Sequence, residues 1–379
     1  MKIALVHDDF MQFGGAESLF ATIASLWPKA PIYTSIVNRR KLSPSIGRER
    51  IITSFMQKIP LAGRLYKSLL PLYPLAFESF NFGEFDVVFS STTRFSKSIV
   101  TKPNTVHVCY INSVPRFLWD EEVKKEYLPK FLLILFSPYL SWLKRWDKAA
   151  SQRVDFYIAN SKNVAARIQK YYGRESAVVY PFADLNFYRT AKIHNWELKS
   201  QDYYLVVSRL VKWKKIDLAV KAANELGVNL KIVGVGPDAS RLKRLAKSQQ
   251  PTAVSRQQSA ISQIEFLGRV TKEALRELYQ NCRALIVTQE EDFGIASVEA
   301  QACGVPLVAY DAGGQQETVT SETGVLFKNQ SAQDLKDAIL ASRDVKWSQS
   351  ACRKNSRRFS QAVFVKELTR IARKYQYNP

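Results

Sequence analysis

Hydrophobic positions along the chain form short apolar runs, and helix-like segments separate these runs from the first residue onward. The first run, Ile3 to Val6, precedes a glycine pair at Gly14 and Gly15 and a helix-like segment from Ala16 to Leu26. A strand, a glycine turn and a helix in this order are typical of a doubly wound sheet. Because continuous apolar strands are usually buried on both faces, the pattern predicts a parallel sheet covered by helices.

The same alternation occurs in two separate parts of the chain. Further strands are predicted in the first part at Ala30 to Tyr33, Val87 to Phe89, Thr105 to Tyr110, Phe156 to Ala159 and Ala177 to Val179, and in the second part at Tyr203 to Val207, Leu230 to Val233, Ile264 to Leu267, Ala284 to Val287 and Leu307 to Ala309. Such sheets bind ligands at the carboxyl ends of their strands. The sequence therefore predicts two α/β domains, each with a binding edge.

Domain boundaries follow from the chain length and from the loss of this alternation. A chain of 379 residues fits two domains of ordinary size. Polar and aromatic residues without a period fill Tyr180 to Gln201, which indicates a linker. We predict a first domain at 1–185, a linker at 186–201, a second domain at 202–360, and a C-terminal helix in 361–379 that is able to pack back on the first domain. The Gln- and Ser-rich stretch 247–263 is predicted to be a loop.

The composition is that of a globular protein, with 46% hydrophobic and 23% charged residues. The four cysteines, Cys109, Cys282, Cys303 and Cys352, are too far apart in sequence for the close pairs of a zinc site or a small disulfide framework. The opening residues lack the pattern of a signal peptide. A cytoplasmic location is expected.

A net charge of +21 and a pI near 9.7 predict that the surface attracts polyanions. Nucleic acid, anionic lipid and phosphorylated substrates are the candidates. The sequence has no zinc-finger spacing, no RRM-like aromatic motif and no basic-region helix, so a nucleic-acid partner is not expected. Lipid and phosphate remain.

The longest apolar stretch, Phe131 to Leu143, is flanked by basic residues and is shorter than the ~20 residues that span a bilayer. Two interpretations stay open for it. It is either a buried helix or an interfacial segment at the cytoplasmic face of a membrane, with Leu132, Leu133, Leu135 and Trp142 entering the interface.

The segment that carries most chemical information runs from Glu291 to Glu299, after a predicted strand and into a helix. Backbone amides near Phe293, Gly294 and Ile295 at such a helix start form an anion site. Glu291, in the loop, could accept sugar hydroxyls, and Glu299, in the helix, could accept a ribose diol. The alternative is a helix with ordinary surface acids.

Two cations, Arg209 and Lys214, follow the first strand of the second part at its carboxyl end. Fixed cations there suit a departing diphosphate, because they stabilise its developing negative charge without a metal. The alternative is a solvated basic turn. A tight turn at Gly234 and Gly236 ends the next strand, and such a turn alone is weak evidence for a ligand.

Together these segments resemble family 4 of the retaining glycosyltransferases, and the match runs over nearly the whole chain. The resemblance implies the GT-B fold, which consists of two Rossmann-like, doubly wound domains facing a cleft. The cations that bind the donor pyrophosphate in that family fall on Arg209 and Lys214. The family's glutamate pair falls on Glu291 and Glu299, and its Gly-Gly-Ala-Glu motif falls on Gly14 to Glu17.

On the acceptor side, the family usually carries His-Thr where this chain has Asn112-Ser113. The resemblance therefore assigns the contact with the transferred sugar to Asn112. His107, five residues earlier, is either a substitute in the cleft or a buried strand residue. The other cleft residues implied by the family motifs are Gly14, Gly15, Glu17, Arg116 and Asn160, with Gly15 facing the donor.

The resemblance implies a metal-independent, retaining hexosyltransferase without a cofactor, in which Arg209, Lys214, Glu291 and Asn112 serve the reaction. The donor is a nucleotide diphosphate sugar, held by these cations and by Gly234, Gly236, Phe293, Gly294, Ile295 and Glu299. The chain is most similar in character to GDP-mannose-dependent mannosyltransferases that build surface polysaccharide or glycolipid on a glycan or lipid-linked acceptor. A UDP-sugar transferase and a non-catalytic sugar-nucleotide or polyanion-binding protein on the same scaffold are the alternatives.

Overall fold

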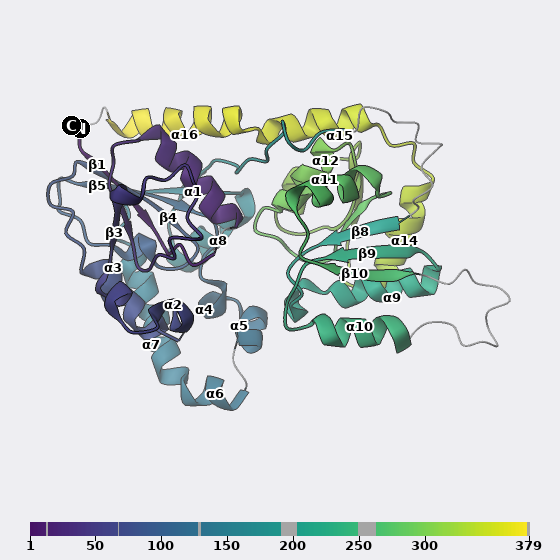
Figure 1. Cartoon of the computed structure of the whole chain (residues 1–379), viewed down its shortest axis with the longest axis horizontal. Helices are drawn as coiled ribbons and strands as arrows, with labels where there is room; N and C mark the ends of the chain where they lie inside the picture. The colour runs from purple at the N-terminus through teal and green to yellow at the C-terminus, as the bar shows by residue number, and fades with distance from the viewer. Residues whose placement is uncertain (13, 67, 128–129, 191–202, 249–262, 377–379) are drawn as a thin grey trace. The chain divides into compact units, whose positions relative to one another are not determined.

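The computed structural model describes residues 1–12, 14–66, 68–127, 130–190, 203–248 and 263–376, which form two compact units, Met1–Tyr180 and Pro181–Pro379 (Figure 1). Most of the predicted linker at 186–201 and of the predicted loop at 247–263 lies outside the described residues.

The first unit is built on a seven-stranded parallel sheet with the order β3-β2-β1-β4-β5-β6-β7. Its strands are β1 (Ile3–His7), β2 (Ile32–Thr34), β3 (Ile51–Thr53), β4 (Val87–Thr92), β5 (Val106–Ile111), β6 (Phe156–Ala159) and β7 (Ser176–Val178). Its helices are α1 (Gly15–Leu26), α2 (Ala62–Leu65), α3 (Tyr73–Glu78), α4 (Arg116–Trp119), α5 (Glu121–Tyr127), α6 (Lys130–Leu135), α7 (Ser137–Ser151) and α8 (Lys162–Tyr172).

The second unit is built on a six-stranded parallel sheet with the order β10-β9-β8-β11-β12-β13. Its strands are β8 (Tyr203–Val207), β9 (Asn229–Val233), β10 (Ile264–Gly268), β11 (Leu285–Val287), β12 (Leu307–Tyr310) and β13 (Gly324–Phe327). Its helices are α9 (Ile216–Leu226), α10 (Ala239–Ser248), α11 (Lys272–Asn281), α12 (Ile295–Ala302), α13 (Gln315–Thr318), α14 (Ala332–Arg343), α15 (Gln349–Ser356) and α16 (Gln361–Gln376).

Helices cover both faces of the second sheet, with α9, α10 and α14 on one face and α11 and α12 on the other (Figure 1). The central strands have apolar side chains on both faces, so two separate clusters of buried residues form, one under each helix layer. This double burial explains why the strands appear in the sequence as continuous apolar runs. The predicted doubly wound α/β fold is confirmed in both units.

The two strands that the apolar pattern did not predict, β3 and β13, are both edge strands. Each has partly exposed positions, and β13 begins with Gly324. A strand with one open edge needs less apolar surface than a central strand, so its sequence carries a weaker signal. No helix among the described residues is long and apolar enough to cross a membrane.

Both sheets reverse their strand order at one internal point. In the first sheet the reversal falls between β1 and β4, and in the second it falls between β8 and β11. The loops that leave the carboxyl ends of two such strands diverge to opposite sides and open a crevice between them. The residues after β1, β4, β8 and β11 therefore line the expected binding positions.

Candidate functional site

In the second unit, oppositely charged side chains meet at the point where the strand order reverses. Lys214 follows β8 and Glu291 follows β11, and their Nζ and Oε1 atoms lie 2.6 Å apart. Lys214 is buried, and the Thr288 hydroxyl donates a hydrogen bond of 2.7 Å to its carbonyl oxygen. The ion pair and this hydrogen bond tie the loop after β8 to the end of β11.

The electrostatics of Lys214 depend on its neighbours in these two loops. Burial lowers the pKa of the ammonium group, the Glu291 carboxylate raises it, and the positive charge of Arg209 lowers it. Arg209 itself is exposed. The structure thus brings together the two cations and the first glutamate that the sequence singled out.

The start of α12 supplies backbone donors next to this pair. Gly294 precedes the helix with a φ of +90°, a conformation that favours glycine, and a Cβ there would lie 2.3 Å from Nε2 of Gln315. The first amides of a helix have no partner within the helix, which creates an anion site. Phe293 points into the interior against Phe359, so its contribution to such a site is its backbone.

Gln315, at the start of α13, was not predicted to belong to the site. Its side chain is fully buried, its Oε1 accepts a hydrogen bond from the Ser297 hydroxyl, and its Nε2 has no hydrogen-bond partner among the described residues. A buried donor without a partner is costly, and this one lies beside Gly294. The glycine pair that precedes Gln315 was the available sequence signal.

Gly234 and Gly236 hold the loop after β9 against the loop after β8. A Cβ at Gly234 would lie 1.8 Å from the carbonyl oxygen of Ser208, and one at Gly236 would lie 2.1 Å from that of Leu210. The absence of side chains therefore permits backbone contact on both sides of Arg209. These glycines position the Arg209 loop, and a direct donor contact from them stays a prediction.

Glu299 lies in α12 beneath two tyrosines. Burial raises the pKa of its carboxyl group to about 7, against hydrogen bonds from Tyr279 and Tyr188 that lower it. The Tyr279 hydroxyl lies 3.1 Å from Oε2. Glu299 therefore changes charge near neutral pH, and its predicted role as an acceptor for a ribose diol stays a prediction.

In the first unit, Asp8 lies at the reversal point between β1 and β4 and binds the loop that follows β4. Sequence reasoning missed this residue. Its carboxylate accepts hydrogen bonds from the backbone amides of four residues after β4, at 2.6–2.9 Å, and from two threonine hydroxyls. Burial raises the pKa of Asp8, but Arg94, His7 and the backbone donors outweigh burial and lower it to about 2. The carboxylate fixes the loop after β4 as a bound anion would.

Asp9, Arg94 and Tyr73 form a second charged group at the same point. The Arg94 guanidinium donates to the buried Asp9 carboxylate, and the Tyr73 hydroxyl lies 3.4 Å from the same carboxylate. The acid pair directly after the first strand was the sequence signal for both groups. It was not recognised because no basic partner lies nearby in sequence.

Asn112 follows β5 and is tied to the end of β4. Its side-chain Nδ2 donates to the Ser91 hydroxyl at 3.1 Å, and its main-chain carbonyl oxygen accepts from Nδ2 of Asn160 at 2.8 Å. Asn112 is partly buried, and no hydrogen bond to its Oδ1 occurs within the described part of the chain. The structure thus brings together Asn112 and Asn160, and it leaves the Asn112 side chain an acceptor atom for a ligand.

His107 does not belong with the cleft residues where the sequence analysis had placed it as one alternative. It is fully buried within β5, its Nε2 lies 2.8 Å from the Ser90 hydroxyl, and burial lowers its pKa to about 3. A neutral imidazole inside the sheet cannot meet a sugar at the sheet edge. The buried-strand interpretation is the one that the structure favours.

Hydrogen bonds or ion pairs within the first unit hold three further predicted cleft residues, Gly14, Glu17 and Arg116. The Glu17 carboxylate accepts from the Gly14 amide at 2.9 Å and caps α1, and Arg116 pairs with Asp120 at 2.7 Å. A Cβ at Gly15 would meet no neighbouring atom, so this position of α1 is open. Glu17 and Arg116 shape the first unit locally, and their contact with an acceptor stays a prediction.

Two parallel sheets with charged groups at their reversal points define a two-domain, Rossmann-like class of ligand-binding protein. Residues 13–187 match the family described as Glycosyltransferase Family 4, and residues 189–359 match the family described as Glycosyl transferases group 1. The two ranges together span nearly the whole chain. The chain therefore belongs to the glycosyltransferases, with a Family 4 domain in its first part and a group 1 domain in its second part.

Relatives of known description match part of the chain. A D-inositol 3-phosphate glycosyltransferase of Mycobacteroides abscessus is 32% identical over 209 residues, which are 51% of this chain and 45% of that protein. A GDP-mannose-dependent monoacylated alpha-(1-6)-phosphatidylinositol monomannoside mannosyltransferase of Corynebacterium glutamicum is 32% identical over 143 residues, or 35% of each chain. The chain spans about half the length, or less, of the curated relatives it matches.

A solved structure is similar over both units. The Anabaena protein Alr3699/HepE, in complex with UDP, superposes with a TM-score of 0.69 at 18% identity and covers 99% of this chain and 100% of its own. Identity at this level supports the fold. The GT-B fold expected from the sequence is therefore confirmed.

The pKa of Glu299 predicts how sugar-nucleotide binding depends on pH. Below about pH 7 the side chain is a neutral acid, and above it the side chain is a carboxylate, which accepts hydrogen bonds from hydroxyls more strongly. If Glu299 binds a ribose diol, the affinity for a sugar nucleotide should rise several-fold between pH 6 and pH 8. Calorimetric titration measures this, and a sugar nucleotide is used because its pyrophosphate has no proton to lose in this range.

Glu299→Gln should remove the step, whereas Glu322→Gln, which alters an exposed acid, should keep it. The same pH dependence in Glu299→Gln and the wild-type protein would contradict the assignment of Glu299 to the ribose.

Proposed function

We propose that this protein transfers a sugar from a nucleotide diphosphate donor, bound by the second unit, to an acceptor bound by the first. The observation that carries this proposal is the pair of Lys214 and Glu291 at the reversal point of the second sheet, with Arg209 close to it. Family membership and the unpartnered donor of Gln315 support it.

The proposed reaction needs negative charge to be stabilised on the departing diphosphate. The bond between the anomeric carbon and the β-phosphate oxygen breaks, and a bond from that carbon to an acceptor oxygen forms on the same face. The acceptor proton passes to the departing phosphate, so the leaving group acts as the base. Arg209, Lys214 and the first amides of α12 hold the charge, which requires no divalent metal.

Glu291 has two uses in this mechanism. Its carboxylate keeps a buried lysine cationic, since burial alone lowers the Lys214 pKa. It also places an acceptor of hydrogen bonds beside the diphosphate position, where the transferred sugar presents hydroxyls. Asn112 is proposed to contact the sugar from the first unit through its unused Oδ1.

GDP-mannose is the proposed donor. The Corynebacterium mannosyltransferase uses GDP-mannose according to its description, which supports this choice, whereas the Anabaena structure contains UDP. A UDP-sugar donor is therefore the second candidate. Thermal-shift measurements with GDP, UDP and ADP discriminate between them, and stabilisation by none of the three would favour a non-catalytic role on this scaffold.

A lipid-linked acceptor at a membrane is proposed from the surface of α6. Phe131, Ile134 and Leu135 are 68%, 75% and 67% exposed, and Phe136 and Trp142 follow with large exposed areas. Arg145 and Lys148 on α7 are exposed as well. Exposed apolar and basic side chains on two consecutive helices suit an anionic bilayer interface.

The structure revises which residues are expected to enter the membrane. Leu133 packs against the core of the first unit, as do Leu140 and Leu143 of α7, whereas the Leu132 side chain lies outside the described residues. Each interpretation of the apolar stretch therefore fits one part of it. The largely exposed α6 fits an interfacial segment, and the inner face of α7 fits a buried helix.

Substitution of the cations should impair turnover strongly. Lys214→Ala or Arg209→Ala removes charge that faces the departing diphosphate, so kcat should fall about 10²–10³-fold. Steady-state kinetics in EDTA measures this, with Lys221→Ala on the exposed side of α9 as the control that keeps activity. Near-normal turnover of both variants, or wild-type activity that EDTA abolishes and magnesium restores, would refute this view of the site.

Asn112→Ala should lose most transfer activity while the affinity for the nucleoside diphosphate, which depends on the second unit, stays within about twofold of wild type. Asn112→His should retain activity, because an imidazole also offers a hydrogen bond to a sugar hydroxyl. Transfer rates and nucleotide titrations on the same preparations separate the two effects. Normal turnover of Asn112→Ala would remove this residue from the sugar contact.

The protein should bind anionic vesicles weakly and in a salt-sensitive manner. Basic residues near an anionic surface contribute about 1 kcal/mol each, and exposed apolar side chains add to this. Cosedimentation with phosphatidylglycerol and phosphatidylcholine vesicles tests the preference, and the triple variant Phe131→Ser, Ile134→Ser, Leu135→Ser should lose it. Leu340→Ser, an exposed apolar residue of the second unit, is the control. Equal binding of the triple variant and the wild-type protein would exclude α6 as the membrane contact.

A further inference from the structure

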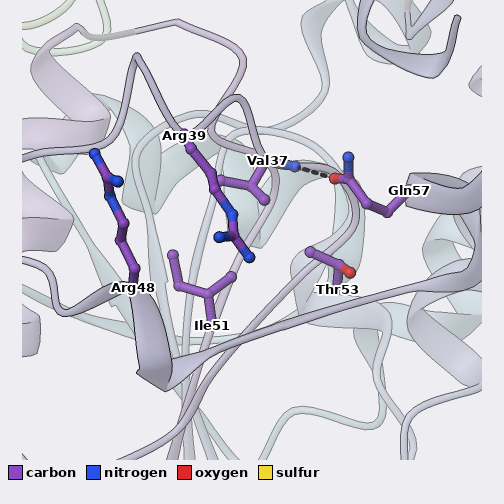
Figure 2. Close-up of a pocket in the computed structure, with 6 residues that line it drawn as sticks. All are labelled: Val37, Arg39, Arg48, Ile51, Thr53 and Gln57. Atoms are coloured by element: carbon purple, nitrogen blue, oxygen red, sulfur yellow. Dashed lines mark hydrogen bonds between the residues drawn. The ribbon is translucent and has the colours of Figure 1, made fainter.

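A small pocket in the first unit lies along the edge strand β3. Its lining residues are Val37, Arg39, Arg48, Ile51, Thr53 and Gln57, and its volume is about 240 Å³ (Figure 2). Typical small-molecule sites measure ~300–1,000 Å³. The pocket therefore suits one compact group rather than a whole sugar nucleotide, and none of its residues belongs to the donor or sugar contacts proposed above.

The polar groups of this pocket are mainly hydrogen-bond donors. Oε1 of Gln57 accepts a hydrogen bond of 2.8 Å from the Val37 amide, as Figure 2 shows, so the group that Gln57 has left for a ligand is its NH₂. Thr53 adds a hydroxyl, and Arg39 and Arg48 add two guanidinium groups. No lining residue is acidic.

Arg39 and Arg48 line the pocket without a partner of their own among the described residues. Both are exposed, and neither guanidinium forms an ion pair or hydrogen bond within the described ranges. In contrast, Arg50 donates to backbone carbonyl oxygens, and Arg94 and Arg116 pair with carboxylates. Two unpaired like charges beside one pocket repel each other unless an anion lies between them.

The nearest acid in sequence, Glu49, does not neutralise the pair. A Cβ at Gly47 would lie 2.0 Å from Oε1 of Glu49, so this carboxylate is folded back against the backbone of Gly47. Its charge raises the pKa of Arg50, against the larger effect of burial. The pocket keeps its positive charge.

We propose that this pocket binds a phosphate group carried by the acceptor. Guanidinium groups bind oxyanions through paired N–H donors, and two of them match the tetrahedral oxygens of a phosphate monoester or diester better than the planar oxygens of one carboxylate. Val37 and Ile51 provide an apolar contact for the carbon atoms next to the phosphate. This inference rests on the proposed function, because it names the chemistry of the acceptor.

Phosphate of this kind has two sources, a soluble sugar phosphate or the headgroup of a phospholipid. The test uses glucose 1-phosphate for the first, glycerophosphoinositol for the second, and glucose as the neutral control. Each is titrated by calorimetry into the full chain saturated with the nucleoside diphosphate that it binds, so that the donor position is occupied. Whichever phosphate binds more tightly identifies the source.

Wild-type protein should bind at least one phosphate probe and not glucose. Arg39→Gln and Arg48→Gln should each weaken binding by about three- to tenfold, and the double variant by about 30-fold, as expected for exposed charge-assisted contacts. Added salt should weaken wild-type binding as well. Arg40→Gln, an exposed arginine next to the pair in sequence, should leave binding unchanged.

Absence of phosphate binding to the wild-type protein, or equal binding to the wild-type protein and the double variant, would overturn the proposal. Nucleoside diphosphate affinity is measured on the same variants and should be unaffected. If the wild-type protein binds no nucleoside diphosphate at all, the proposed transferase function fails, whereas the phosphate titration is still decisive for the pocket.

Discussion

The ion pair of Lys214 and Glu291 is the constraint on which the second unit depends. A parallel sheet that reverses its strand order leaves a crevice at the reversal, and the loops on either side must be held by side chains because no ladder of backbone hydrogen bonds joins them. A buried lysine there is stable only with its carboxylate. The ion pair that joins these two loops thus places a cation where a diphosphate would be bound.

The first unit meets the same topological problem with the opposite charge. Asp8 lies at its reversal point and takes up backbone amides that could otherwise bind an anion. The nucleotide-binding potential of such a crevice is therefore used internally in one unit and kept for a ligand in the other. This difference supports the proposed division, in which the second unit binds the donor and the first unit binds the acceptor.

Sequence reasoning predicted the parts of this structure that rest on local patterns. Central strands such as β6 and β8 appear in the sequence at the bounds that the structure shows, because their burial on both faces requires apolar residues throughout. Arg209, Lys214 and Glu291 were singled out because they follow predicted strands at the carboxyl end, and because they match family motifs. Asp8 and Gln315 were missed because their partners come from distant segments, which no spacing within the sequence reveals. His107 was ambiguous for a related reason, since only the packed sheet shows which strand residues reach its edge.

The two glycines that flank the Arg209 loop bear on how such a protein can be altered. At Gly234 and Gly236 the neighbouring backbone occupies the space that any side chain would need. The loop geometry thus requires that these positions carry no side chain, and any substitution there would displace the loop rather than shift it slightly. Laboratory evolution toward a different sugar would therefore find few useful variants there, and productive diversity would have to come from positions whose side chains have room to vary.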